Sequence, residues 1–290
     1  MSIRLKMALI AMLGTASACI DNVQNQARAS IVVSSTAPTV LQAANGVSLT
    51  LTNAQLAFGP LYLCASNSAG EDCETARGQW LGSVVIDLLN SAPQEAGKLE
   101  GIEGEVRSYM FDLGAASLLT QQDPVLLDAA QALGGNSLRL AGRAQLADGQ
   151  QVDLTIDMLW AQGDQVEQGV SLIRTPNDAI EPFVLRGEEG TFALDFDPTP
   201  WLDIANFDTL IDDASCALDG PEQVCAGSRE LRCAADGTVM SETDCALSGQ
   251  ACIRDMGCTD RVSIDEGQVL RVLTQRVVAG VRPTLRWQER

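Results

Sequence analysis

The chain has 290 residues, of which 38 are acidic and 19 are basic, and it contains no histidine. A formal net charge of −19 repels phosphate backbones, so we expect no nucleic-acid partner. The lack of histidine excludes Ser-His-Asp and Cys-His catalysis and histidine-bound metal sites, and we expect no cofactor.

The N-terminal segment, residues 1–18, has the layout of an export signal. Arg4 and Lys6 precede an apolar stretch that is too short to span a bilayer, and small residues then lead to Cys19. This run resembles the bacterial lipoprotein signal. The resemblance implies that Cys19 becomes the first mature residue and receives acyl chains such as palmitate. With Ile20 after it, the resemblance also implies the outer membrane, on its periplasmic side or at the cell surface. An ordinary signal that leaves Cys19 free or paired is the alternative.

Short alternating segments dominate the rest of the chain. Residues 19–40 are small and polar without a lasting period, which predicts a flexible tether. The pattern over residues 41–215 and 260–290 indicates a mainly β body, an antiparallel β-sandwich with a short helix. The clearest element is a hairpin, in which the period-two runs 138–146 and 152–160 flank an Asp-Gly turn.

The remaining elements are predicted by the same reasoning. We expect further strands at 47–51, 80–89, 106–113, 191–197, 269–273 and 285–287. A single helix is predicted over residues 125–133, with Asp123 as N-cap, Pro124 in the first turn and Gly134 at the end. The two strands after residue 260 are too few to fold alone, so they are expected to pair with the body.

Residues 216–259 are therefore predicted to be a small disulfide-rich insertion in the body. The six cysteines there are Cys216, Cys225, Cys233, Cys245, Cys252 and Cys258. With so little apolar surface, this module needs covalent bonds to keep its shape. Fifteen connectivities are possible, and the spacing does not select one. Zinc is the alternative, although the Cys-x2-Cys steps typical of structural zinc sites are absent. A further disulfide between Cys64 and Cys73 is expected to close a local loop.

Carboxylates are the remaining candidates for chemistry. Asp195 and Asp197 are expected to share the solvent face of strand 191–197, and Asp203 follows six residues later. Such a group would suit the acid and base of a glycan hydrolase, or a calcium site. The sequence contains no EF-hand loop, and solvated side chains in a very acidic protein are the alternative explanation.

The whole layout resembles that of uncharacterised lipoproteins of myxobacteria, through the six-cysteine segment 216–258 and the closing segment 282–287. This resemblance implies no activity and no catalytic residue. We therefore expect a lipid-anchored protein of the cell envelope, non-enzymatic, whose body and module bind another protein or a glycan. A carboxylate-dependent glycan hydrolase and a calcium-dependent adhesion module are the alternatives.

Overall fold

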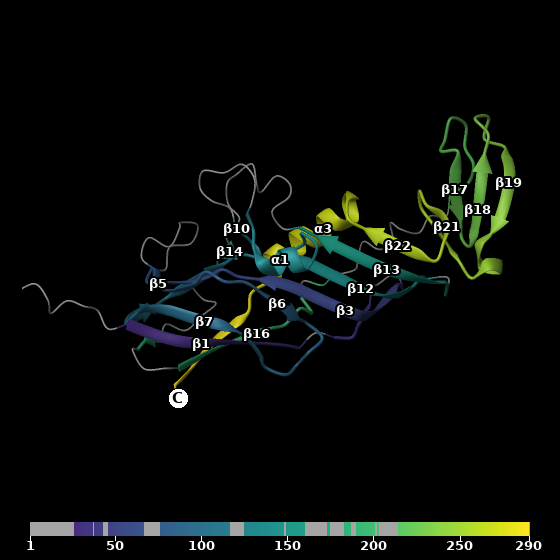
Figure 1. The fold of residues 1–290 in the computed structure, drawn as a ribbon. Helices are drawn as coiled ribbons and strands as arrows, with labels where there is room; N and C mark the ends of the chain where they lie inside the picture. Colours follow the sequence, from purple (N-terminus) through teal and green to yellow (C-terminus); the bar gives the residue numbers. More distant parts are fainter. Residues whose placement is uncertain are drawn as a thin grey trace, which may run out of the picture.

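The computed structural model describes residues 26–36, 38–42, 46–66, 76–116, 125–147, 149–159, 173–174, 183–186, 190–200, 202 and 214–289. In these residues, an eight-stranded and a six-stranded sheet form a sandwich, and a smaller unit projects from one end of it (Figure 1). The predicted fold, mainly β with a short helix and a disulfide-rich insertion, is confirmed.

The eight-stranded sheet brings together strands from the whole length of the body. Its order is β14 (Ile173–Arg174), β9 (Ser108–Phe111), β4 (Leu61–Cys64), β5 (Ala76–Trp80), β7 (Gln94–Ile102), β1 (Gln26–Ser35), β16 (Gly190–Phe196) and β23 (Thr284–Glu289). Strands β1 and β16 are parallel, and the other neighbours in this sheet are antiparallel. The first and last described strands of the body therefore lie on either side of β16.

Strand β1 contradicts the predicted tether over Gln26–Ser35, whereas residues 19–25 of that prediction lie outside the described residues. Ala27, Ala29, Ile31 and Val33 are buried and alternate with more exposed residues, so the segment has the period of a half-buried strand. It lies between β7 and β16, where both edges of its backbone are hydrogen-bonded. The alternation was missed because small side chains give this segment little apparent hydrophobicity.

The six-stranded sheet is built around the predicted hairpin. Its order is β2 (Val40–Gln42), β3 (Ser48–Phe58), β12 (Leu138–Gln145), β13 (Gln151–Met158) and β22 (Arg261–Ile264), with β6 (Val84–Asp87) also paired to β3. Strands β12 and β13 pair in antiparallel register over their full length, which confirms the hairpin. Strand β22 adds to β13 in parallel, so residues beyond the disulfide-rich segment complete this sheet.

Aromatic rings join the two sheets in the core. Phe58 of β3 lies 5.3 Å from Phe111 of β9 and 5.4 Å from Phe196 of β16, measured between ring centroids. All three side chains are buried, and Trp80 packs beside Phe58 with a centroid separation of 6.3 Å. Contacts of this kind hold the sheets face to face at the spacing typical of a sandwich.

The helices and short strands differ from the prediction in several places. Residues 269–273, predicted as a strand, lie in helix α3 (Gly267–Gly280), where Val269, Leu273 and Val277 are buried at four-residue spacing. A short apolar run fits either structure, which explains the error.

Among the described residues, no helix is long and apolar enough to cross a membrane.

The predicted helix over 125–133 is shorter than expected. Its first residues form strand β11 (Val125–Leu126), which pairs with β10 (Ala115–Ala116), and helix α1 covers only Asp128–Ala132. Asp123 and Pro124 lie outside the described residues, and Leu127 is the N-cap. The strands predicted at 80–89 and 106–113 are each split, the second into β8 (Gly104–Val106), which pairs with β15 (Phe183–Leu185), and β9.

The projecting unit consists of residues 214–259 and has two small sheets of its own. One is formed by β17 (Gln223–Ala226), β18 (Arg229–Cys233) and β19 (Val239–Asp244), and the other by β20 (Ala251–Ile253) and β21 (Gly257–Thr259). Because β16 precedes it and β22 and β23 follow it, the unit is an insertion between strands of the sandwich. Figure 1 shows it at the opposite end from the start of β1.

Candidate functional site

The six late cysteines form three disulfides within the projecting unit. The pairs are Cys216–Cys233, Cys225–Cys252 and Cys245–Cys258. The chain segments that the three disulfides close overlap in sequence, so each disulfide links its segment to the next. Cys225, Cys245 and Cys252 are buried together. None of these six is therefore a thiolate that could bind zinc. Cys64 is also disulfide-bonded, whereas Cys73 and the predicted lipid site Cys19 lie outside the described residues.

The acidic cluster predicted from sequence is divided among structural roles. Asp195 accepts a hydrogen bond from the Ser34 hydroxyl of β1 and pairs with Arg286 of β23. Asp197 Oδ1 accepts a hydrogen bond from the backbone N–H of Thr199, 3.0 Å away, and so stabilises a turn. Asp203 lies outside the described residues. Over the described part of the chain, no three His, Cys, Asp or Glu side chains are placed to hold a metal ion.

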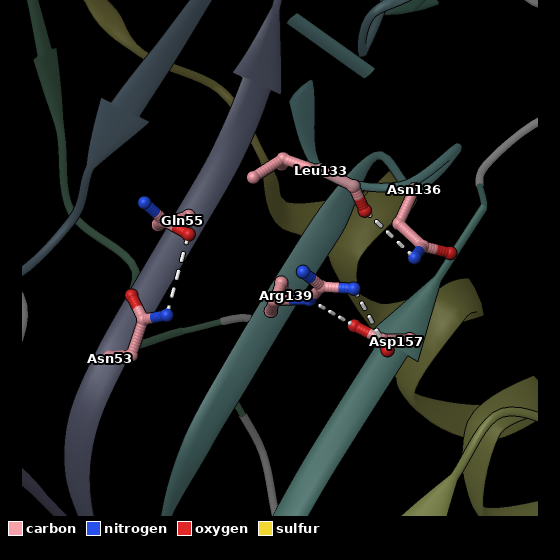
Figure 2. Close-up of polar contacts among 6 residues, drawn as sticks. All are labelled: Asn53, Gln55, Leu133, Asn136, Arg139 and Asp157. Carbon is pink, nitrogen blue, oxygen red and sulfur yellow. Dashed lines mark hydrogen bonds and ion pairs between the residues drawn. The ribbon is translucent and has the colours of Figure 1, made fainter. Parts of the chain in front are cut away.

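A row of polar side chains crosses the outer face of the six-stranded sheet. Gln55, Arg139 and Asp157 are in register on β3, β12 and β13. Figure 2 shows the Arg139 guanidinium and the Asp157 carboxylate meeting in a two-point contact, with Nε–Oδ1 at 2.7 Å and a terminal nitrogen 3.2 Å from Oδ2. This contact raises the pKa of Arg139. Gln55 accepts a hydrogen bond from Asn53 of the same strand.

A pocket of about 400 Å³ opens at the end of the eight-stranded sheet where β1 begins. Its polar and apolar lining includes Gln26, Arg28, Arg77, Gln79, Glu100 and Ile102, from β1, β5 and β7. Glu100 of the middle strand is in register with Arg28 on one side and with Gln79 on the other. Pairing of three strands thus gathers residues that are far apart in the sequence. The volume is within the range typical of small-ligand sites.

Glycines shape the wall of this pocket. Gly78 and Gly101 are paired across β5 and β7, and a Cβ atom at Gly101 would lie 2.2 Å from the carbonyl oxygen of Arg77. A Cβ atom at Gly104 would lie 2.9 Å from Arg77 Nε and 3.0 Å from its Cζ. The Arg77 side chain therefore lies directly against the backbone of β8, an approach that only glycine allows.

The two arginines of the pocket differ from many of the other arginines in their ion pairing. Ion pairs are made elsewhere by Arg107, Arg139, Arg143, Arg229, Arg232 and Arg286. In the part of the chain that the structure describes, Arg28, Arg77 and Glu100 make no hydrogen bond or ion pair through their side chains, and Arg77 Nε is buried without an acceptor. Among the residues that the structure describes, the pocket lining thus holds two guanidinium groups without a hydrogen-bonding partner and one carboxylate, in a protein that is otherwise strongly acidic.

Sequence reasoning missed all three of these residues. Arg28 was placed in a tether, and Arg77 and Glu100 have no motif around them. Recognition of the period-two pattern in β1 would have placed Arg28 on the outward face of a strand. No sequence signal, however, gives the register that brings β7 and β5 beside it.

Comparisons with known proteins add little to this picture. No family model matches the chain, and no curated protein matches it. Among solved structures, MbnP from Methylosinus trichosporium is similar over 59% of this chain and 74% of that chain, with 14% sequence identity and a TM-score of 0.28. A likeness at that TM-score supports no inference about fold or function.

Proposed function

We propose that this chain is a lipid-anchored protein of the outer membrane that binds a glycan or another protein through an anionic group and does not transform it. The observation on which the proposal rests is the pocket with two unpaired guanidinium groups, Arg28 and Arg77. Arginine holds carboxylates and phosphates by directed, charge-assisted hydrogen bonds. Glycoside hydrolysis instead needs two carboxyl groups flanking the bond, and among the described residues of the pocket lining Glu100 is the single carboxylate.

The arrangement of the molecule is consistent with anchoring through Cys19. Strand β1, whose first residue is Gln26, begins at one end of the sandwich, and the disulfide-bonded unit projects from the other (Figure 1). Anchored near Gln26, the protein would hold this unit away from the membrane. The exposed large apolar side chains on the unit are Leu218, Val239, Met240, Leu247 and Met256.

Intact mass measurement tests the anchor. The full chain, expressed in a Gram-negative host, is expected to lose residues 1–18 and to gain the mass of a diacylglyceryl group and an acyl chain at Cys19. The Cys19→Ser variant is expected to lack both acyl additions and to leave the membrane fraction. Wild-type protein that carries no acyl mass would contradict the proposed anchoring.

Calorimetric titration tests binding as opposed to catalysis. Protein comprising residues 20–290, which contains every described element, is titrated with an acidic oligogalacturonate and with a neutral maltooligosaccharide of equal length. We expect binding of the acidic ligand alone and its loss in the Arg28→Ala/Arg77→Ala double variant. Release of reducing ends that disappears in Glu100→Gln would instead identify a hydrolase.

A further inference from the structure

In its described lining, the pocket at the start of β1 combines two cations with one anion, and this combination restricts the ligand further. We infer that it binds a zwitterionic phosphate ester, with Arg28 and Arg77 bound to phosphate oxygens and Glu100 facing an ammonium group on the same ligand. The inference deepens the proposed function and rests on it, since it names the anionic group that the pocket recognises. Phosphoethanolamine is the simplest ligand of this class.

The spacing of the arginines favours phosphate over carboxylate. Arg28 lies on β1 and Arg77 on β5, with β7 between them, so their backbones are two strand spacings apart, about 10 Å. Both residues belong to the lining of one pocket. A carboxylate presents both oxygens in one plane and is satisfied by one guanidinium fork. A tetrahedral phosphate presents oxygens in several directions and therefore accommodates two guanidinium groups.

Glu100 sets the second requirement on the ligand. It lies on β7, between the strands that bear the arginines, and it is in register with Arg28. Its carboxylate nevertheless forms no ion pair with the described residues around it. A bare phosphate placed between the arginines would be repelled by this carboxylate, whereas a ligand that also bears an ammonium group would find a partner for each charge.

Arg77 is held in place before any ligand arrives. Its side chain lies against Gly104, and its Nε is buried. A long side chain that is already ordered loses less conformational entropy when it binds, which strengthens binding. Gln26 and Gln79 line the same pocket and add neutral amide groups that donate hydrogen bonds.

Titration of the soluble chain, residues 20–290, tests the inference with defined probes. Glycerophosphoethanolamine is expected to bind more tightly than inorganic phosphate, and ethanolamine alone is expected not to bind. Arg28→Ala and Arg77→Ala should each weaken binding by about tenfold or more, since each removes a charged hydrogen-bonding partner. Arg143→Ala, which removes the same charge from the other sheet, is the matched control and should leave the affinity unchanged.

The Glu100→Gln variant distinguishes recognition of the ligand's ammonium group from recognition of its phosphate. Removing the carboxylate should raise the affinity for inorganic phosphate and abolish the preference for glycerophosphoethanolamine. An unchanged preference in this variant would overturn the role of Glu100. Wild-type protein that binds no phosphate ester at millimolar concentrations would overturn the inference as a whole, and binding of oligogalacturonate in the same experiment would show that the proposed function survives.

The same chemistry can come from a lipid headgroup or from a decorated glycan, and vesicles distinguish the two. The soluble chain is mixed with vesicles of digalactosyldiacylglycerol, a lipid without phosphate, that do or do not contain phosphatidylethanolamine, and the bound fraction is sedimented. Binding that needs phosphatidylethanolamine and both arginines supports a headgroup ligand. Binding of glycerophosphoethanolamine without binding to vesicles supports the ester on a glycan. Acylation of Cys19 is measured separately and does not affect either result.

Discussion

Arg77 lies against Gly104, where a Cβ atom would come within 2.9 Å of the Arg77 Nε and 3.2 Å of its Cδ. Gly104→Ala is therefore expected to displace the Arg77 side chain while leaving both pocket charges in the protein. The affinity for glycerophosphoethanolamine should fall about as far as in Arg77→Ala, by roughly tenfold. Titration calorimetry measures the loss, and the melting temperature is recorded alongside it.

A control variant at a second glycine distinguishes the displacement of Arg77 from the effect of backbone strain. Gly104 has φ of 152°, so an alanine there is strained whatever surrounds it. Gly149 also has a positive φ, 87°, but nothing lies within 4 Å of its Cβ position. Gly149→Ala should lower the melting temperature without changing the affinity. If Gly104→Ala also lowers the melting temperature without changing the affinity, Gly104 does not position Arg77 for binding and has a structural role only.

Two ion pairs on the same hairpin allow the effect of solvent exposure to be measured. Arg139–Asp157 and Arg143–Asp153 both join β12 to β13 in register, but the side chains of the first pair are 34% and 22% exposed and those of the second 59% and 54%. Double-mutant cycles on unfolding free energy should give a coupling of about 0.5–1 kcal/mol for the first pair and about 0.3 kcal/mol or less for the second. Equal couplings would contradict this ranking.

The parts of the fold that were predictable are those in which local pattern and burial agree. The β12–β13 hairpin has strict alternation and an Asp-Gly sequence between its two runs, and the two strands pair as expected. The apolar run from Val269 to Leu273 fits a strand as well as a helix, so its pattern did not predict helix α3. The four-residue spacing of the helix becomes clear only when Val277, which is also buried, is included. Strand β1 was missed because alanine and serine carry little hydrophobic signal.

The candidate site was much less predictable than the fold. Arg28 and Arg77 are 49 positions apart in the sequence, and Glu100 lies 23 positions beyond Arg77. They meet only because β7 pairs with β1 on one side and with β5 on the other. Strand order and register depend on long-range pairing, which the composition of a single strand does not determine. The disulfide connectivity was not predictable for the same reason. Which cysteines pair depends on how distant segments of the unit fold together.

Gly257 is expected to contribute to the stability of the disulfide-rich unit. It has φ of 71°, and a Cβ atom there would lie 2.5 Å from Glu230 Oε2, which accepts a hydrogen bond from the Cys258 backbone N–H. Gly257→Ala adds the loss of this charge-assisted hydrogen bond to backbone strain. Gly249→Ala, with φ of 72° and open space around it, adds strain alone. Chemical denaturation should show Gly257→Ala to be less stable than Gly249→Ala by about 1–2 kcal/mol. Equal stabilities of the two variants would mean that the Glu230 side chain moves away from the added methyl group without loss of unfolding free energy.

Tyr109 and Pro283 join parts of the eight-stranded sheet that are far apart in strand order. The Tyr109 hydroxyl, on β9, donates a hydrogen bond to the Pro283 carbonyl next to β23, and the ring is fully buried. At neutral pH, Tyr109→Phe leaves that carbonyl without its donor and should cost about 1–2 kcal/mol of unfolding free energy. Thermal or urea denaturation of the two proteins measures the difference.

The same hydroxyl makes stability depend on alkaline pH. Burial raises the pKa of Tyr109 above its ordinary value, and the nearby charge of Arg282 opposes that rise. Because the folded-state pKa lies above the unfolded one, the contribution is intact below pH 10, where tyrosine is protonated in both states. Above about pH 10 only the unfolded chain loses the proton, so stability should fall by up to about 1.4 kcal/mol per pH unit from this group. Tyr109→Phe should show a shallower decline, and identical slopes in the two proteins would mean that Tyr109 ionises without resistance from the fold.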